Sequence, residues 1–333
     1  MRARLESWLH RQWAKCGLFA WLFSPLSLLF LIISQSKRRN ACPEKLSVPV
    51  VVVGNIYVGG TGKTPVTIAL VKALEQRGWT PGVISRGFGR KDQDCQMVDS
   101  HAQAEQVGDE PLLIAQQTQV PVAVGRVRSQ AAKLLLRQHP QCNLIISDDG
   151  LQHYSLARDV ELAVVGARGL GNGWVLPAGP LRETPRRLDE VDAIVLNATE
   201  DTIATHTPRF AATSTLGLAR SLDGKRSLVL DEIARSGRSV FAAAGIAAPD
   251  RFFAMLRAHD IQGETLQLCD HYDFSDNPFA QRKEDIILIT GKDAVKCRQI
   301  PEIANDPRIY MVEYLVDIDP YLVDLVESKI KKD

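Results

Sequence analysis

The sequence has no pair of cysteines in the close CxxC spacing that zinc sites and redox motifs use. Its six cysteines are scattered along 333 residues. This distribution suits reduced thiols in the cytosol better than a disulfide framework or a zinc site. An excess of one charge is also missing, because the formal net charge is +1, and the composition therefore predicts no nucleic-acid partner. A hydrophobic content of 45% indicates a folded globular protein.

The segment from Cys16 to Ser36 carries no charged side chain. It has no small-residue cleavage site, which argues against a secretory signal. Its most apolar part, Leu18–Ile33, is near the lower length limit for a membrane-spanning helix and contains Pro25. Basic residues flank it on both sides, against the positive-inside bias for a single span. We expect it to lie in the membrane face, with a spanning helix and a buried core helix left open.

The first forty residues are strongly basic, whereas the rest of the chain is mildly acidic. Glu6 is their only acid, against seven basic residues: Arg2, Arg4, Arg11, Lys15, Lys37, Arg38 and Arg39. This asymmetry points to an anionic surface as the partner of the N-terminus.

After Pro43 the sequence alternates between buried strands and amphipathic helices. Apolar runs predict strands at residues 48–54, 81–85, 120–125, 143–148, 160–167 and 191–197, with helices at 65–77, from about residue 109, and at 129–138. The stretch between residues 86 and 107 looks irregular. The alternation predicts an α/β fold with a doubly wound, mostly parallel sheet of the P-loop NTPase type.

A polar transition near residues 198–238 separates this series from a second, smaller one. The second series has strand-like segments at 239–246, 285–290 and 308–316, and helices at 251–258, from residue 292, and at 321–331. We therefore expect three parts: a membrane-associating segment (1–40), a nucleotide-binding domain (41–215), and a smaller α/β domain that closes a cleft (216–333).

The stretch "VGNIYVGGTGKTP" (residues 53–65) follows the first strand and opens the first helix of the series. In this context glycines let backbone N–H groups surround phosphate oxygens, here at Gly59, Gly60, Thr61 and Gly62. Lys63 supplies a charge to the β- and γ-phosphates, and Thr64 supplies a hydroxyl to Mg²⁺. The usual first glycine is replaced by Tyr57, for which the doubled glycine compensates. The motif predicts a nucleotide site.

The end of another predicted strand carries two carboxylates, which supports this prediction. "LIISDDG" ends in Asp148 and Asp149, as the metal-binding strand of a P-loop enzyme should. Alone, the same letters are equally typical of a capped turn. Which of the two acids contacts Mg²⁺ stays open.

Several motifs together resemble the tetraacyldisaccharide 4′-kinases, the lipid A kinases of Gram-negative bacteria. They cover nearly the whole chain: the apolar N-terminus, the phosphate loop, "VISRGFGR" (83–90), "VGDEP" (107–111), "DDGLQH" (148–153), "LPAGPLRE" (176–183), "AGIAAPDRFF" (244–253), "DHYDF" (270–274) and "KDAVKC" (292–297). The resemblance implies ATP-dependent phosphorylation of the 4′-hydroxyl of a tetraacylated glucosamine disaccharide 1-phosphate, giving lipid IV-A. It also implies a peripheral or monotopic enzyme on the cytoplasmic face of the inner membrane, in contact with its lipids.

The resemblance also assigns roles that the residues alone leave open. It implies that Asp109 is the base, paired with His271 across the cleft. From sequence alone, Asp109 is better explained as an acid that stabilises a helix start. Second-tier members of the site are Glu110, Gln152, His153, Arg182 and Arg86.

The chain departs from the family pattern at a few positions. Phe88 and Tyr272 replace a tyrosine and a second histidine, and Thr184 stands where proline is more common. Gly291 replaces an acid in the motif that ends with Lys292 and Asp293, which puts the role of that motif in doubt.

The main alternative is a membrane-associated P-loop ATPase of the positioning or partitioning kind, without a lipid acceptor. Those proteins carry a lysine just before the paired glycines, where this chain has Val58. A non-enzymatic anchor does not explain intact Lys63, Thr64 and Asp148. A soluble small-molecule kinase does not explain the apolar N-terminus.

Overall fold

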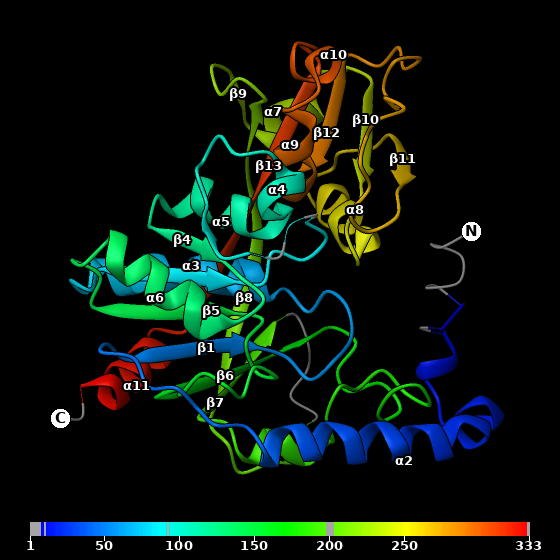
Figure 1. Cartoon of the computed structure of the whole chain (residues 1–333). Helices are drawn as coiled ribbons and strands as arrows, with labels where there is room; N and C mark the ends of the chain where they lie inside the picture. Colours follow the sequence, from blue (N-terminus) through cyan, green and yellow to red (C-terminus); the bar gives the residue numbers. More distant parts are fainter. Residues whose placement is uncertain (1–7, 10, 91, 93, 198–202, 332–333) are drawn as a thin grey trace.

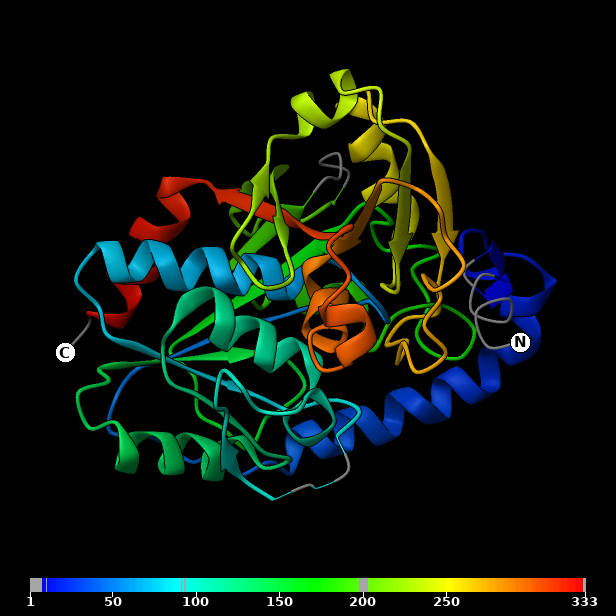
Figure 2. The same cartoon turned by 90° about the horizontal axis from the view of Figure 1, so that it is seen from above.

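The computed structural model describes residues 8–9, 11–90, 92, 94–197 and 203–331. Of the basic cluster at the N-terminus, Arg2 and Arg4, together with Glu6, lie outside the described residues. The rest of the chain forms one continuous mixed sheet with helices on its faces (Figures 1 and 2).

The sheet is mostly parallel and runs through both expected domains. Its strand order is β11-β10-β12-β13-β8-β7-β6-β1-β5-β2-β4-β3, with β9 paired to β8. The strands are β1 (Val50–Gly54), β2 (Pro81–Ser85), β3 (Gln96–Met97), β4 (Val122–Val124), β5 (Leu144–Asp148), β6 (Val160–Gly166), β7 (Ala193–Asn197), β8 (Arg209–Ser221), β9 (Ser227–Leu228), β10 (Val240–Ala244), β11 (Glu264–Gln267), β12 (Ile286–Thr290) and β13 (Ile309–Ile318).

The helices follow the predicted alternation, with small shifts at their ends. They are α2 (Leu18–Arg39), α3 (Lys63–Gln76), α4 (Ala104–Val107), α5 (Asp109–Thr118), α6 (Arg128–Gln138), α7 (Leu230–Arg235), α8 (Pro249–Ala258), α9 (Gly291–Cys297), α10 (Pro301–Ala304) and α11 (Pro320–Ile330), with a 3₁₀ turn at Pro185–Asp189. The predicted α/β fold is confirmed. The stretch expected to be irregular, residues 86–107, contains the short elements β3 and α4.

The first half of the sheet is buried on both faces, as its continuous apolar strands require. In β1, Val51 and Val53 face a core shared with α3, α5 and α11. Val50 and Val52 face the opposite core, which includes α6. Successive side chains of a strand point to opposite faces, so a strand covered on both faces must be apolar throughout.

The second half repeats this arrangement around β10, β12 and β13. One core holds Phe252 and Phe253 of α8. The other holds Ala294 of α9 together with Phe274 and Phe279. Both halves therefore present the carboxyl ends of parallel strands, where ligand sites of α/β proteins form.

Two long antiparallel strands, β8 and β13, join the halves. The start of β8 pairs with β7, and its later residues pair with β13, with a bulge between Val312 and Tyr314. The boundary expected between residues 215 and 216 falls inside β8. After β13 the chain returns to the first half, where α11 contributes Leu322 and Val326 to the core. The division into domains at that boundary stays a prediction.

Helix α2 lies along one edge of the molecule (Figure 1). Most of its apolar side chains are exposed. In the described part of the chain it is the one helix long and apolar enough to cross a membrane, judged by length and composition. It contains Pro25, and Lys37, Arg38 and Arg39 occupy its last turn, where positive charge stabilises a helix.

Candidate active site

The loop before α3 has the backbone conformation of a phosphate loop. Gly59 has φ 104° and Gly62 has φ 84°, the left-handed region that favours glycine. Lys63 then begins α3, so the first N–H groups of this helix point back toward the loop. Such a helix N-terminus attracts anions.

Buried asparagines hold this loop in place. Asn55 donates a hydrogen bond to Thr61 Oγ1 at 2.9 Å, and Asn197, at the end of β7, donates to Thr61 O at 2.9 Å. A Cβ on Gly62 would lie 1.9 Å from Asn197 Nδ2. The glycine is therefore required by both its backbone conformation and its neighbour.

Tyr57, which replaces the usual first glycine, has a structural role. Its side chain is buried in the core that contains Leu181. The two residues also form an isolated antiparallel bridge. The tyrosine thus connects the phosphate loop to the "LPAGPLRE" loop.

The two carboxylates after β5 have different surroundings. Asp148 is buried and accepts a hydrogen bond from Thr67 Oγ1 at 2.9 Å, whereas Asp149 lies 3.6 Å from Lys63 Nζ and 3.1 Å from Arg182 Nη1. Burial, with the charges of Glu110 and Asp149, raises the pKa of Asp148 to about 7. Burial acts the same way on Asp149, but Lys63 and Arg182 outweigh it and hold the pKa of Asp149 below its usual range.

The carboxylates after β5 could bind a divalent cation with only a few protein ligands. Asp148 Oδ2 is buried and makes no hydrogen bond within the described residues. In the same residues no group of three or more His, Cys, Asp or Glu side chains is arranged for a metal ion. Mg²⁺ in phosphate sites is typically held by one or two carboxylates, with water and phosphate completing its shell. Asp148, Asp149 and Thr64 meet that requirement.

Gln152 and Arg182 belong to one polar network with Asp149. Arg182 Nη1 also donates to Gln152 Oε1 at 3.3 Å, and Gln152 Nε2 donates to Glu183 Oε1 at 2.7 Å. Glu183 is buried and accepts a further hydrogen bond from the hydroxyl of Tyr154. The network fixes the side chains that follow β5.

His153 and Arg86 lie in a positively charged region beside this network. Burial and the charge of Arg128 lower the pKa of His153 to about 3, so the ring is neutral at pH 7. Arg128 is itself buried and donates to Gly125 O at 2.9 Å. Arg86 is exposed, and its charge acts on both groups.

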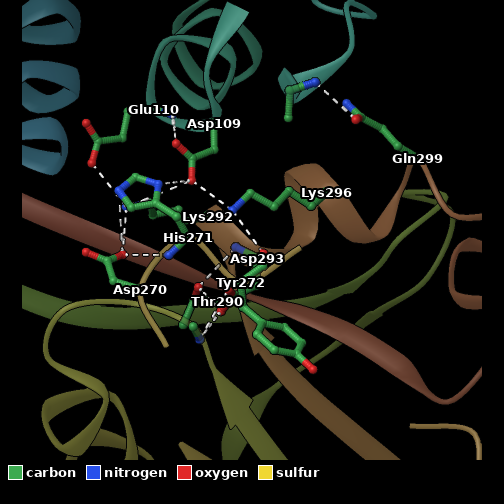
Figure 3. A network of polar contacts seen from close by, with 12 residues as sticks. Asp109, Glu110, Asp270, His271, Tyr272, Thr290, Lys292, Asp293, Lys296 and Gln299 are labelled. Carbon is green, nitrogen blue, oxygen red and sulfur yellow. Dashed lines mark hydrogen bonds and ion pairs between the residues drawn. The ribbon is translucent and has the colours of Figure 1, made fainter. Parts of the chain in front are cut away.

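Asp109 and His271 meet across the two halves of the sheet (Figure 3). Asp109 opens α5, and His271 lies between β11 and β12 in a left-handed conformation with φ 61°. Asp109 Oδ2 is 2.8 Å from His271 Nδ1 and 3.1 Å from Lys296 Nζ. Burial would raise the pKa of Asp109, but the hydrogen bond from His271 and the charges of Lys292 and Lys296 hold this pKa well below its usual range.

Lys292 is a member of this network that the sequence did not reveal. Its Nζ is 3.1 Å from both Glu110 Oε1 and Asp270 Oδ1. Glu110 in turn acts electrostatically on Asp148, at the end of β5. Lys292 and Lys296 are one turn apart on α9, a spacing visible in "KDAVK" that places both on one helix face.

Gly291 does not disturb the motif in which it replaces an acid. Thr290 caps α9 by accepting from Asp293 N, and Asp293 accepts from Gly245 N at 3.1 Å. These contacts join β12 to the end of β10. The nearest heavy atom to a Cβ on Gly291 would be 3.5 Å away, so a side chain has room there.

Comparison with known proteins agrees with this geometry. The family model for tetraacyldisaccharide-1-P 4′-kinase matches residues 19–331. The chain belongs to the tetraacyldisaccharide 4′-kinase family. A tetraacyldisaccharide 4′-kinase of Herminiimonas arsenicoxydans is 47% identical over 99% of this chain and 97% of its own length. One of Dechloromonas aromatica is 43% identical over 98% of each chain.

A solved structure shares the fold. The enzyme of this family from Aquifex aeolicus, crystallised in complex with ATP, superposes with a TM-score of 0.80 at 27% identity, covering 94% of this chain and all of its own. Membership in a kinase family does not favour the alternative of a positioning or partitioning ATPase.

Most residues predicted for the site lie in two connected groups. One group surrounds the phosphate loop and the end of β5, and includes Gln152 and Arg182. The other contains Asp109, Glu110 and His271. The residues that sequence reasoning missed are Asn55, Arg128, Tyr154, Glu183, Asn197, Asp270, Lys292 and Lys296. Five of them are polar side chains inside quoted motifs, and their place in those motifs was the available signal: Asn55, Glu183, Asp270, Lys292 and Lys296. The catalytic and binding roles of all these residues stay predictions.

Proposed function

We propose that this protein transfers the γ-phosphate of ATP to the 4′-hydroxyl of a tetraacylated glucosamine disaccharide 1-phosphate, giving lipid IV-A. The observation that carries the proposal is the Asp109–His271 hydrogen bond of 2.8 Å, formed between the two halves; the neighbouring Glu110 acts electrostatically on Asp148 at the end of β5. A kinase needs an acceptor-positioning base next to its nucleotide site. This arrangement meets that need.

In this proposal the phosphates of ATP lie against Gly59, Gly60, Thr61 and Gly62. Their N–H groups bind phosphate oxygens, and Lys63 adds a positive charge near the transferring group. Thr64, Asp148 and Asp149 would hold Mg²⁺, which would neutralise phosphate charge when bound. Lys63 Nζ and Asp149 Oδ1 are 3.6 Å apart, so the ammonium group of the phosphate loop lies beside the carboxylate that follows β5.

Asp109 acts as the base toward the sugar hydroxyl. Phosphoryl transfer has a loose transition state in which little proton abstraction is needed early, so a carboxylate of low pKa suffices to orient and finally accept the proton. His271 donates to Oδ2 and thereby orients the carboxylate. Asp109 Oδ1 accepts only the N–H of Glu110 at 3.0 Å, among the bonds of the described residues.

The second-tier residues orient this machinery and its anionic ligands. Arg182 pairs with Asp149 at 3.1 Å and would contact the transferring phosphate. Gln152 and Glu110 hold Arg182 and Lys292 in place. Arg86 and the neutral His153 are suited to contact phosphate oxygens at the mouth of the site.

We also propose that α2 holds the enzyme on the cytoplasmic face of the bacterial inner membrane as a peripheral or monotopic protein. A tetraacylated substrate stays in the bilayer, so the enzyme must reach it there. The basic last turn of α2 attracts anionic lipids. In this scheme residues 1–40 bind the membrane, 41–215 bind ATP, and 216–333 close the cleft.

The test is incubation of purified full-length protein with Mg-ATP and the disaccharide lipid, followed by mass spectrometry. The expected result is a gain of one phosphate, lost in Lys63→Ala and in Asp109→Ala. Lys72→Ala and Glu75→Ala, which change exposed side chains of α3, are matched controls and should keep activity. ATP hydrolysis by the wild type without a phosphorylated lipid would contradict the proposal.

A further inference from the structure

The motif "AGIAAPDRFF" (244–253) of the second half lies against the phosphate loop of the first half. It covers the end of β10, a short loop and the first turns of α8. A Cβ on Gly60 would lie only 2.8 Å from the Cβ of Ala247, so the two segments approach as closely as a glycine allows. Arg168, which follows β6, donates to Ala247 O at 3.2 Å. The second half therefore contacts the phosphate loop itself.

Arg251, in the first turn of α8, extends this contact through a buried asparagine. Its Nη2 donates to Asn197 Oδ1 at 3.1 Å, and Asn197 Nδ2 donates to Thr61 O at 2.9 Å. Asn197 is completely buried, where an unsatisfied polar group is costly. These two hydrogen bonds connect α8 to the backbone of the phosphate loop.

Arg251 helps to decide which way the amide of Asn197 faces. The amide oxygen accepts from Arg251 and from Ser214 Oγ, each at 3.1 Å. An arginine only donates hydrogen bonds, and the carbonyl oxygen of Thr61 only accepts them. With the amide reversed, Arg251 would face the NH₂ group and Thr61 O would face an oxygen. The arginine thus favours the orientation in which Asn197 donates to the loop.

The peptide bond after Thr61 carries this effect to the phosphate-binding side of the loop. In a trans peptide the C=O of one residue and the N–H of the next point in opposite directions. An asparagine bonded to Thr61 O therefore holds the N–H of Gly62 pointing away from Asn197. Gly62 N–H is one of the groups that bind phosphate oxygens in the proposed function.

We propose that Arg251 is a positioning residue for the phosphate loop, which acts through Asn197 and makes nucleotide binding depend on the second half. The inference rests on the proposed function, in which the loop binds the phosphates of ATP. Arg251 itself makes no contact with the nucleotide in this scheme. Its guanidinium is held over the ring of Tyr314 in β13, 5.7 Å from the centroid.

The experiment measures binding of a nucleotide that a kinase cannot use. Full-length protein in detergent micelles is titrated calorimetrically with the magnesium complex of the β,γ-imido analogue of ATP. Arg251→Met keeps an apolar stem but has no donor, and its dissociation constant should rise about tenfold or more. Arg251→Lys restores a donor and should recover most of the affinity. Arg257→Met is the matched control, because it removes the same charge from an exposed position of α8 and should bind normally.

A double-mutant cycle tests whether Arg251 acts through Asn197. Asn197→Ala should weaken binding by itself. Adding Arg251→Met should then weaken it little further, because the connection to the loop is already broken. In turnover of the lipid, Arg251→Met should raise the KM for ATP and leave kcat nearly unchanged. General loss of folded protein would lower the apparent kcat and leave the KM as it is.

The proposal is overturned if Arg251→Met binds the analogue as tightly as the wild type, or if its effect and that of Asn197→Ala add. Additive losses mean that Arg251 acts on the nucleotide by another route. A fall in kcat without a rise in KM would also overturn it. Should either variant not fold, Arg251→Leu or Asn197→Ser replaces it. The titration needs no lipid, so a wild type that binds the analogue but makes no phosphorylated lipid refutes the proposed function alone.

Discussion

The exposed apolar face of α2 allows a sharp test of membrane association. Its large side chains are mostly accessible: Leu18, Trp21, Leu22, Leu26, Leu28, Leu29, Ile32 and Ile33 are between 47% and 86% exposed. Complete burial of one such side chain contributes about 2 kcal/mol, so these eight, which are about half exposed or more, would gain about 8 to 10 kcal/mol in a membrane. This gain is an upper estimate for a helix that lies with this face in lipid.

Deleting the N-terminal 36 residues is the obvious perturbation, but the structure argues against it. Ser27 accepts a hydrogen bond from Ala178 N at 3.0 Å and donates to Val175 O at 2.9 Å. Trp13 Nε1 donates to Pro177 O at 3.0 Å. These contacts support the loop that carries Arg182, so a truncated enzyme would lose activity for reasons unrelated to the membrane.

Substitution of two exposed residues avoids this problem. Leu22→Glu with Leu29→Glu removes side chains that are 72% and 53% exposed and leaves Ser27 in place. Losing their burial and inserting two acids should weaken binding by about 3 to 6 kcal/mol, that is, by about 100-fold or more. Binding is measured by flotation with vesicles that contain anionic lipid.

The same variant should bind ATP normally and lose turnover of vesicle-presented substrate. Val229→Glu is the matched control, because Val229 is 43% exposed and precedes α7, at the far side of the molecule from α2 (Figure 1). Wild-type vesicle binding by the double variant would refute the assignment of this face to lipid.

Three further outcomes follow from the contacts of the site. Gly62→Ala should abolish ATP binding in a calorimetric titration. Gly78→Ala is the control, because Gly78 also has a left-handed backbone (φ 88°) but a Cβ there would have no atom within 4 Å. It should lose only the roughly 1 to 2 kcal/mol of stability that a left-handed residue costs. Tyr154→Phe leaves the buried carboxylate of Glu183 with one donor fewer and should cost about 1.5 to 3 kcal/mol of unfolding free energy in urea, while Tyr321→Phe, 72% exposed, should cost nothing measurable. Because the pKa of Asp109 is lower in the folded protein than in the unfolded chain, ionised Asp109 stabilises the fold at pH values above the unfolded pKa of about 4. This contribution is lost as the pH falls toward the pKa of the folded state. Asp109→Asn should therefore show a weaker loss of urea stability between neutral pH and about pH 3 than the wild type, and an equal loss would refute that linkage.

Local signals were enough to predict the phosphate loop and the strands around it. The run "VVVVG" followed by glycines and Lys63 specifies strand, loop and helix within contiguous residues, and the structure has β1 and α3 there. Tyr57 was treated as a departure from the glycine pattern. Its burial against Leu181 depends on a loop more than a hundred residues later, which no local pattern reports.

The acceptor side of the site was not predictable from spacing. Asp109 and His271 are brought together by the pairing of distant strands, and only the resemblance to a family suggested their contact. Lys292 was quoted within a motif without a role, since its partners Glu110 and Asp270 come from elsewhere in the chain. Strand β8 was not predicted as a single element. Its middle residues pair with β13 in a two-stranded region in which both faces are partly exposed, so the sequence has no regular alternation of apolar and polar residues there.

The path of β8 and β13 has a consequence for how the protein folds during synthesis. Ala219 of β8 pairs with Val312 of β13, so the chain passes into the second half and returns from it at neighbouring points. The second half is therefore inserted into the first half, which we call the parent half. One core of the parent half needs Leu322 and Val326 of α11, which are synthesised after the inserted half. The nucleotide-binding half therefore cannot complete this core until α11 has been synthesised, although it contains the earlier part of the chain, and the inserted half can fold first.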